Sequence, residues 1–476
     1  MVEQEIKNYR GYWWLPHNPN TIISGNLCIN PNKGIELDTV GSLLSIQEVL
    51  DAVDESDTDK VLLGKTVDGK AVTLIDWYHS KSNRTYSDSQ LDLSISSYSA
   101  KFAIVGKRHF INKDEIIFTS AEARFNLLDE WLSVTGFNFH EKEDERGFSQ
   151  FNLEYVYPNK LEFYIDDISS TFSTNYFFNT QYSNLNWRLS HKSFLKLTPD
   201  KSESLDWYMK QFYEIQKLLT IMTGFPVDPI AFRGYGIDIN INKEQKIQEE
   251  FEIYLQTHNN FNDNFENYPT QLLLTVPHLR SQLSVIVNNW FRKAEILAPA
   301  ITLYVATIST RLGYAEFQLL NYAQALEALH RRVFGGQYMS DEEYTPISTI
   351  LIDNIPNNLS KSHRDSLKSR LKYANEFSQR KRIKELLDQV WENCLTHFIH
   401  NKNEFIDQVI STRNYLIHYD ESSASKAVFG SEIFYLAQRL KILLLTHILI
   451  NIGNPQESVY LAIKGFEPFQ YLKKRN

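Results

Sequence analysis

The segment RLGYAEFQLLNYAQALEALHRRVFGG, residues 311–336, decides the fold class of the second half of this chain. Its apolar side chains recur every three or four residues, which places them along one stripe of a helix. The stripe consists of Leu319, Tyr322, Ala323, Leu326 and Leu329. The pair Gly335-Gly336 then supplies a stop, because glycine readily adopts the left-handed conformation that ends helices. The segment therefore predicts one long amphipathic helix.

Similar patterns continue from this helix toward the C-terminus. Four further stretches with helical periodicity are joined by short polar loops, and they occupy residues 366–378, 381–400, 403–419 and 432–452. Successive amphipathic helices with short connections pack as an antiparallel bundle. We therefore expect the chain to be all-α from about Leu283 onward.

The first half of the chain follows a different pattern. Short β-like runs, separated by Gly, Asn and Asp, extend from Tyr9 to about Lys196. The dipeptide Asp68-Gly69 lies between the runs VLLGKTV and KAVTLI, which is the signal of a tight β-hairpin. This half is expected to be a β-rich domain.

Between the two halves the pattern changes twice. Residues 204–224 have helical periodicity, and two strand-like runs follow, GYGIDINI at 234–241 and TQLLLTVP at 270–277. The expected fold class is multidomain α and β. A β-rich domain would occupy residues 1–280 and an all-α helical bundle residues 281–476.

Composition narrows the classes of function. The chain has 476 residues, 42% of them hydrophobic, and a formal net charge of −9, so it should be compact and should not coat nucleic acid non-specifically. The sequence has only two cysteines, Cys28 and Cys394, and they are far apart, so neither a disulfide framework nor a cysteine zinc site is supported. No secretion signal and no apolar run of the ~18 residues that span a bilayer is visible. The apolar run that starts at Leu440 is short, so we expect a core helix and a cytoplasmic protein.

The stretch STRNYLIHYD, residues 411–420, places three polar residues near the end of a predicted helix. At ~100° per residue, Asn414 and His418 lie on one face one turn apart, and Arg413 can reach the same place through its long side chain. Histidine transfers protons near neutral pH, and an arginine fork binds phosphate and stabilises a charged phosphorane. With the 2′-hydroxyl of RNA as nucleophile, His418 could act as acid or base, Arg413 could bind the phosphoryl oxygens, and Asn414 could orient either partner. No metal is needed for this chemistry.

The same residues also fit a plain helix end. Cations in the last turn interact favourably with the helix dipole, and Asp420 would then pair with one of them. In either case Tyr415, Leu416 and Ile417 are expected to anchor the helix in the core. Spacing alone leaves this interpretation open.

Context supports the catalytic interpretation. The stretch TRNYLIHYD, on a helix late in a helical bundle, resembles the R-(N/D/H)-x-x-x-H signature of HEPN ribonucleases, with Arg413, Asn414 and His418 on the motif positions. The upstream YAQALEALHRRVFGG is similar to the long helix that opens the HEPN bundle in the ApeA-like group. In the first half, GYWWLPHNPNTIISGNLCINPNKGIELDTVG, LLGKTVDGKAVTLID and AEARFNLLDEWL are similar to the ApeA N-terminal domain. The resemblance covers nearly the whole chain.

This resemblance implies a function. HEPN ribonucleases generally act as homodimers through the HEPN domain, so that two motif helices face each other, and they need no cofactor. Members of the ApeA type are associated with bacterial antiviral defence by abortive infection, in which a triggered endoribonuclease cleaves RNA by transphosphorylation. The β-rich half would then be a regulatory or sensor domain, with a viral protein as possible trigger. Two alternatives stay open: a HEPN dimer that binds RNA or protein without cleaving, and an adaptor whose β-rich half recognises a viral component.

A basic segment could add RNA binding. Between Lys361 and Lys384, nine Lys and Arg stand against two carboxylates, a local excess of +7 in an acidic protein. Arg364, Lys368 and Lys372 repeat at helical spacing and could line one face that contacts phosphates. The alternative is a solvated helix face, which is the usual role of a charge run.

Other candidates carry less weight. Glu327, inside the long helix, could hold Arg413 in position, but a surface carboxylate is the simpler interpretation. His330, His397 and His400 are expected to be structural. The run HEKEDER at His140 is expected to be a solvated loop and not a metal site. No glycine loop of the kind that cradles nucleotide phosphates occurs in the sequence.

Overall fold

The computed structural model describes residues 6–44, 60–85, 93–143, 147, 149–242, 245–256, 272–279, 282–310, 313–419 and 421–473. The chain forms two compact units. The N-terminal unit consists of Met1–Gln216 and Val227–Tyr268, and the C-terminal unit of Lys217–Pro226 and Pro269–Asn476. The boundary predicted between residues 280 and 281 lies outside the described residues.

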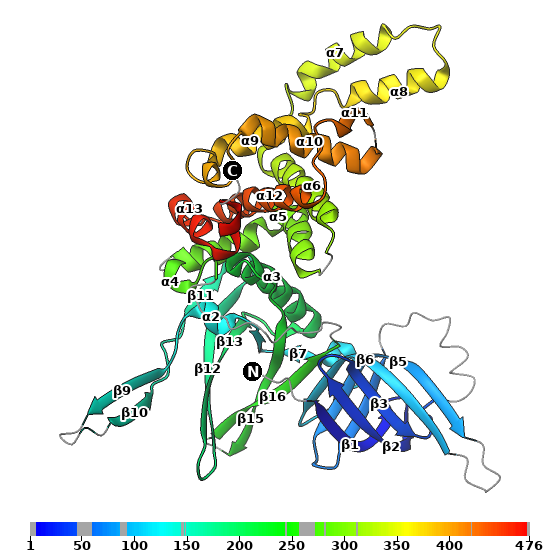
Figure 1. Ribbon diagram of the computed structural model, residues 1–476. Coiled ribbons are helices and arrows are strands. Elements are labelled where there is room, and N and C mark those ends of the chain that lie inside the picture. Colours follow the sequence, from blue (N-terminus) through cyan, green and yellow to red (C-terminus); the bar gives the residue numbers. More distant parts are fainter. Residues whose placement is uncertain are drawn as a thin grey trace. The chain divides into compact units, whose positions relative to one another are not determined.

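A closed six-stranded antiparallel barrel forms the first part of the N-terminal unit (Figure 1). Its strands are β1 (Lys7–Leu15), β2 (Asn18–Asn30), β3 (Gly34–Val40), β4 (Val61–Thr66), β5 (Ala71–Thr85) and β6 (Leu93–Gly106). The order is β6-β3-β2-β1-β4-β5, and β5 pairs again with β6, which closes the barrel. The predicted hairpin at Asp68-Gly69 is confirmed as the β4–β5 turn, with Gly69 at a φ of 86°.

The barrel core forms around the indole of Trp13, which is fully buried. Its neighbours in the core include Leu27, Leu37, Leu74 and Tyr98. A Cβ at position 64 would lie 2.2 Å from the Trp13 ring, so only glycine leaves room for the indole. The Gly64 backbone and the Trp13 side chain are therefore matched across β1 and β4.

The sheet continues beyond the barrel because β16 (Gln245–Leu255) pairs with β6. The order is then β16-β15-β8-β13-β12-β11, and all of these pairs are antiparallel. The bounds are β15 (Pro229–Asn242), β8 (Ser120–Phe125), β13 (Trp187–Pro199), β12 (Ser170–Tyr182) and β11 (Glu162–Ile165). The predicted strand at 234–241 is confirmed as part of β15, so β15 and β16 belong to the N-terminal sheet.

The remaining elements of this half are short or lie beside the sheet. The predicted helix at 204–224 is confirmed as α3 (Leu205–Thr223). The strand predicted at 270–277 is wrong for its described part: Leu273 and Leu274 donate backbone hydrogen bonds to Thr223 and Met222 at the end of α3, and α4 (Val276–Leu279) follows. The other elements are β7 (Ile117–Phe118), α2 (Leu128–Leu132), β9 (Phe137–Glu143), β10 (Ser149–Tyr155) and β14 (Glu203–Ser204).

The C-terminal unit is a helical bundle, as predicted. Besides α4, which lies within the bounds of this unit, its helices are α5 (Leu283–Ser309), α6 (Ala315–Phe334), α7 (Asp341–Asp353), α8 (Lys361–Lys372), α9 (Gln379–Val390), α10 (Lys402–His418), α11 (Glu421–Ala424), α12 (Ser431–Asn451) and α13 (Gln456–Gly465). The predicted helix at 381–400 ends earlier, at Val390, because residues 391–400 turn the chain before Asn401 caps α10.

Helix α12 is the centre of this bundle and packs against α5, α6, α9, α10 and α13. By length and composition it could cross a membrane, and it is longer than the apolar run recognised in the sequence. Most of its side chains are buried inside the bundle, which is the environment expected of a core helix.

Candidate active site

Helix α10 carries the three motif residues, and its packing determines where they point. The buried side chains of α10 are Phe405, Ile406, Val409 and Thr412. At the amino end, the side-chain oxygen of Asn401 accepts hydrogen bonds from the backbone N–H groups of Asn403 and Glu404. The helix is therefore anchored in the core by its first three turns.

The last turn of α10 is much less buried than the sequence predicted. Tyr415 and Leu416 are half-buried and Ile417 is 43% exposed, so the expectation that these three residues anchor the helix is wrong. The helix stops at Tyr419, whose φ of 51° is left-handed and turns the chain away. The motif consequently lies on a helix end that reaches the surface of the bundle.

The structure brings Arg413 and Asn414 together. Nη1 of Arg413 donates a hydrogen bond to Oδ1 of Asn414 over 3.2 Å, and both side chains are half-buried. His418 follows Asn414 by one turn on the same face of α10 and is exposed. A guanidinium carries five N–H donors, and the bond to Asn414 uses one of them. The arrangement thus presents a cation and an exposed imidazole at one end of one helix.

The chain returns along α10 after the motif. The backbone N–H of Val428 donates to Oγ1 of Thr412 over 3.0 Å, and Lys426 pairs with Asp407 over 3.1 Å. Arg380 of α9 also contacts Asp407, at 2.6 Å. The hydrogen bonds from Arg380 and then Lys426 lower the pKa of the Asp407 carboxyl. These contacts hold the segment before α12 against the motif helix.

A groove of about 500 Å³ lies between α10 and this returning segment. Its walls are formed by Asn403, Glu404, Asp407, Gln408 and residues 425–428. Asp407 precedes Asn414 by two turns on the same face of α10, so the groove lies along the face that carries Asn414 and His418.

Exposed aromatic and aliphatic side chains surround the end of α10. The Tyr415 ring contacts the Phe429 ring at 5.2 Å and the Tyr419 ring at 5.6 Å between centroids. Phe429 is 51% and Tyr419 72% exposed, and Ile417, two residues before Tyr419, is exposed as well. An apolar surface next to polar motif residues is typical of a surface that a partner covers.

Family models match both halves of the chain. The description ApeA N-terminal domain 1 matches residues 8–290, which is more than half of the sequence. The chain belongs to the ApeA family. The description Apea-like HEPN matches residues 320–458, which include Arg413, Asn414 and His418. No curated protein and no solved structure gives a significant match to the chain.

The predicted architecture is therefore confirmed, with an ApeA N-terminal domain before a HEPN helical bundle. HEPN domains are generally associated with ribonuclease activity, and the ApeA-type architecture with a defence-associated nuclease role. In the part of the chain that the structure describes, no three His, Cys, Asp or Glu side chains gather closely enough to hold a metal ion.

The structure divides the basic segment of the HEPN domain into two parts. In α9, Arg380 pairs with Asp407, Lys381 lies 3.8 Å from Glu385, and Arg382 is buried. These cations serve contacts within the protein, so the segment is not one continuous basic surface. In α8, Lys368 and Lys372 are exposed, whereas Arg364 is half-buried and contacts Asn357.

Helix α8 forms a hairpin with α7, and neither helix contains a buried residue (Figure 1). The hairpin is closed at its base, where Tyr344 donates to the carbonyl oxygen of Leu371 and Asn375 bonds to Met339 in both directions. Lys368 and Lys372 are thus presented on a helix that is solvated along its length.

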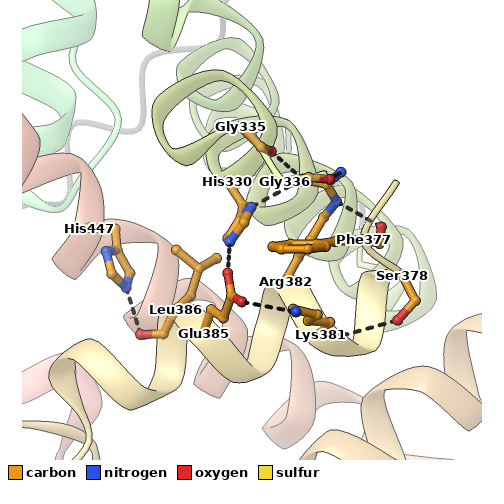
Figure 2. A network of polar contacts seen from close by, with 10 residues as sticks. All are labelled: His330, Gly335, Gly336, Phe377, Ser378, Lys381, Arg382, Glu385, Leu386 and His447. Carbon is orange, nitrogen blue, oxygen red and sulfur yellow. Dashed lines mark hydrogen bonds and ion pairs between the residues drawn. The ribbon is translucent and has the colours of Figure 1, made fainter. Parts of the chain in front are cut away.

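His330, which the sequence could not place, lies in a buried polar network (Figure 2). Its Nδ1 accepts a hydrogen bond from Nη1 of Arg382 at 3.1 Å, and its Nε2 lies 2.8 Å from Glu385. Burial lowers the pKa of His330, although the hydrogen bond to Glu385 acts in the other direction. The neutral imidazole that donates to Glu385 fits both contacts.

Arg382 holds the end of α6 in this network. It donates to the carbonyl oxygens of Gly335, Gly336 and Phe377 at 2.7, 3.2 and 3.1 Å. A Cβ on Gly336 would lie 2.4 Å from Nη1 of Arg382, so glycine both ends α6 and admits the guanidinium. The network joins α6 to α9 and is structural.

The described partner of Glu327 is not Arg413. Glu327 pairs with Arg331 on the same helix at 3.5 Å, and Arg331 reaches Glu376 at 2.6 Å. Among the described contacts, Arg413 is held by Asn414 instead. The described side-chain contact of Arg413 is therefore with its neighbour Asn414 and not with a carboxylate of α6.

Proposed function

We propose that this protein is a metal-independent endoribonuclease whose catalytic residues are Arg413, Asn414 and His418. The observation that carries the proposal is the Arg413–Asn414 side-chain pair beside the exposed His418, at the surface end of one helix in a matched HEPN domain. These are the groups that transphosphorylation needs, because one must stabilise the negative charge on the phosphoryl oxygens and another must transfer protons.

The 2′-hydroxyl of one nucleotide attacks the adjacent phosphorus, and the bond from phosphorus to the 5′-oxygen of the next nucleotide breaks. A base removes the 2′ proton and an acid protonates the departing 5′-oxygen, so charge and atoms balance. His418 takes one of these roles and Arg413 binds the phosphoryl oxygens. The products carry a 2′,3′-cyclic phosphate and a 5′-hydroxyl. Asn414 holds the guanidinium at the angle this requires.

A homodimer would supply the second proton-transfer group. One imidazole cannot be both fully deprotonated as base and protonated as acid at the same moment, whereas two copies of α10 that face each other provide two. The exposed Ile417, Tyr419 and Phe429 beside the motif support such a pairing, because they offer apolar surface for the partner to cover. The active site is then formed by both protomers.

Lys368 and Lys372 on the solvated α8 provide phosphate contacts for the RNA, with Arg364 at the inner edge of the same face. Such contacts give affinity without sequence choice. We place this activity in the bacterial cytoplasm, in antiviral defence by abortive infection, with the N-terminal domain as the regulator that responds to a viral component.

Incubation of the purified chain with total RNA, followed by sequencing of fragment ends, tests this function. Cleavage that yields cyclic phosphate ends and persists in EDTA is expected. Loss of cleavage in EDTA would contradict the metal-independent mechanism. RNA binding without cleavage by the intact protein would instead support the non-catalytic HEPN dimer.

A further inference from the structure

The ribbon formed by β9 and β10 is two-faced. Its register pairs Phe137 with Tyr155, Phe139 with Leu153 and Glu141 with Phe151, so these side chains share one face. The opposite face carries only polar side chains, namely Asn138, His140, Lys142, Gln150, Asn152 and Glu154. One side of this ribbon thus carries its apolar side chains, with carboxylates toward the turn, and the other side is polar throughout.

The hairpin of β12 and β13 has a similar outer end. Phe178 pairs with His191, Thr180 with Leu189 and Tyr182 with Trp187, so all six side chains lie on one face. The Tyr182 and Trp187 rings stack with centroids 5.2 Å apart. An aromatic pair therefore stands at the far end of a second ribbon.

The two ribbons meet at their bases through these same faces. The Tyr155 and Phe178 rings stack at 4.2 Å, and the Tyr155 hydroxyl lies 2.8 Å from Nδ1 of His191. Phe137 also contacts Phe178, at 6.0 Å. Because the contacting side chains belong to the apolar face of each ribbon, both apolar faces turn to the space between the ribbons. We name the four outer rings, Phe139, Phe151, Tyr182 and Trp187, the aromatic fork.

Nothing in the described residues covers the aromatic fork. Phe139 and Phe151 are each 61% exposed, Tyr182 is 74% and Trp187 71% exposed. Figure 1 shows the β9–β10 ribbon standing apart from the large sheet. In the two strands of this ribbon, every residue except the first of β9 and the last of β10 is exposed. An isolated two-stranded ribbon is only marginally stable in water, and aromatic side chains contribute to stability when they are buried. A surface of this kind is suited to a partner.

We propose that the aromatic fork binds an apolar segment of a partner protein that carries Lys or Arg next to its apolar residues. Glu141 and Glu143 lie on the apolar face of β9 toward its turn, so the outer edge of the fork is acidic. These carboxylates attract a basic flank and repel the phosphates of a nucleic acid. Electrostatics therefore favours a protein segment over RNA at this place.

The area of the fork favours a short segment over a second copy of this chain. Four aromatic side chains of roughly 150–250 Å² each, at these exposed fractions, offer about 500 Å². A stable interface between two proteins buries about 800 Å² on each side. A peptide between the two ribbons contacts both apolar faces at once and needs no larger surface. The proposal concerns the N-terminal unit alone and does not depend on the ribonuclease function.

Selection of random short peptides displayed on filamentous phage against the full-length chain tests the proposal. The selected sequences should combine aromatic or aliphatic residues with Lys or Arg. The affinity of a synthetic peptide of the selected sequence is then measured by fluorescence anisotropy. The peptide should bind the double variant Phe139→Ser/Phe151→Ser and the variant Trp187→Ser at least about tenfold more weakly than the parent protein. Gln150→Ser, on the polar face of the same ribbon, should leave affinity within about twofold.

Because all four rings are exposed, the variants should keep the circular dichroism and melting temperature of the parent, which separates lost binding from lost folding. Three outcomes would overturn the proposal. Peptides could bind the parent and the fork variants equally, the selected sequences could be acidic, or no sequence could be selected at all. A concentration-dependent dimer that the double variant loses would overturn it as well, since a second copy would then occupy the fork.

Discussion

The guanidinium of Arg413 donates a hydrogen bond to the side-chain oxygen of Asn414 across 3.2 Å, although the two side chains leave α10 about 100° apart. Arg413 starts on the side of the buried Ile406, two turns earlier, and reaches around the helix to the face that carries His418. The hydrogen bond therefore holds the cation on the side of α10 where Asn414 and His418 lie.

Replacing Arg413 or His418 by alanine should reduce RNA cleavage by at least about 100-fold, because each change removes charge stabilisation or proton transfer. Both side chains reach solvent, so the melting temperature should stay close to that of the parent. Initial cleavage rates and thermal unfolding of the same preparations measure this. Gln389→Ala, exposed on α9, is the matched control. Unchanged cleavage by either motif variant would disprove the site assignment.

Asn414 should act by positioning Arg413. Asn414→Ala releases the guanidinium and should lower kcat by about tenfold with a smaller effect on KM, since the bond matters most when charge develops. Asn414→Asp keeps an acceptor for the guanidinium and should retain more activity than the alanine variant. Steady-state kinetics of the parent and the two variants distinguish positioning from a packing role. A packing role predicts that both variants lose the same amount of kcat and have a lower melting temperature.

Lys368 and Lys372 should contribute to RNA affinity through phosphates. Removing one phosphate contact should decrease the slope of log affinity against log salt concentration by roughly 0.7 for single-stranded RNA. Titrations of Lys368→Ala and Lys372→Ala over a series of salt concentrations measure the slope. Lys384→Ala, exposed on α9, provides the comparison. A slope that is the same in all variants would make the α8 face a solvated surface only.

Arg382 should be essential for stability. Arg382→Met leaves three backbone carbonyl oxygens and His330 without their donor inside the bundle, and should lower the free energy of unfolding by about 3 kcal/mol. Arg380→Met removes only a partly exposed pair with Asp407 and should cost less than about 1 kcal/mol. Urea denaturation of both variants compares them, and equal effects would show that the buried network contributes little.

His447 should make the HEPN domain sensitive to acid. It is buried in α12, donates to the carbonyl oxygen of Leu386 at 2.9 Å, and burial lowers its pKa to about 4. The unfolded state, with an ordinary pKa of about 6.5, binds the proton more readily. Stability is therefore fully present above about pH 6.5 and declines as the pH falls toward 4, by roughly 3 kcal/mol.

His330, whose pKa is also lowered by burial, acts in the same direction. His447→Gln should flatten the dependence of unfolding free energy on pH over this interval, because the amide does not titrate. His363→Gln, exposed on α8, should leave the dependence unchanged. A parallel pH dependence in the parent and the His447 variant would refute the assignment.

Local patterns in the sequence were sufficient for much of this structure. Periodicity and the pair Gly335-Gly336 predicted α6, the dipeptide Asp68-Gly69 predicted the β4–β5 hairpin, and the order of motifs predicted the two-part architecture. The helix and the hairpin depend on neighbours within one or two helical turns or across one tight turn. Such interactions are set by residue type and spacing alone.

Other features depended on contacts between residues far apart in the chain. Tertiary packing buried Arg382 and left Lys368 exposed, although both belong to one basic run, because only Arg382 meets the end of α6. It also left the last turn of α10 at the surface. The aromatic fork arises because strand register aligns rings on one face and Tyr155 packs on Phe178, which joins two ribbons. Spacing within a segment assigns a side chain to a face, but only packing between distant segments decides whether that face is covered.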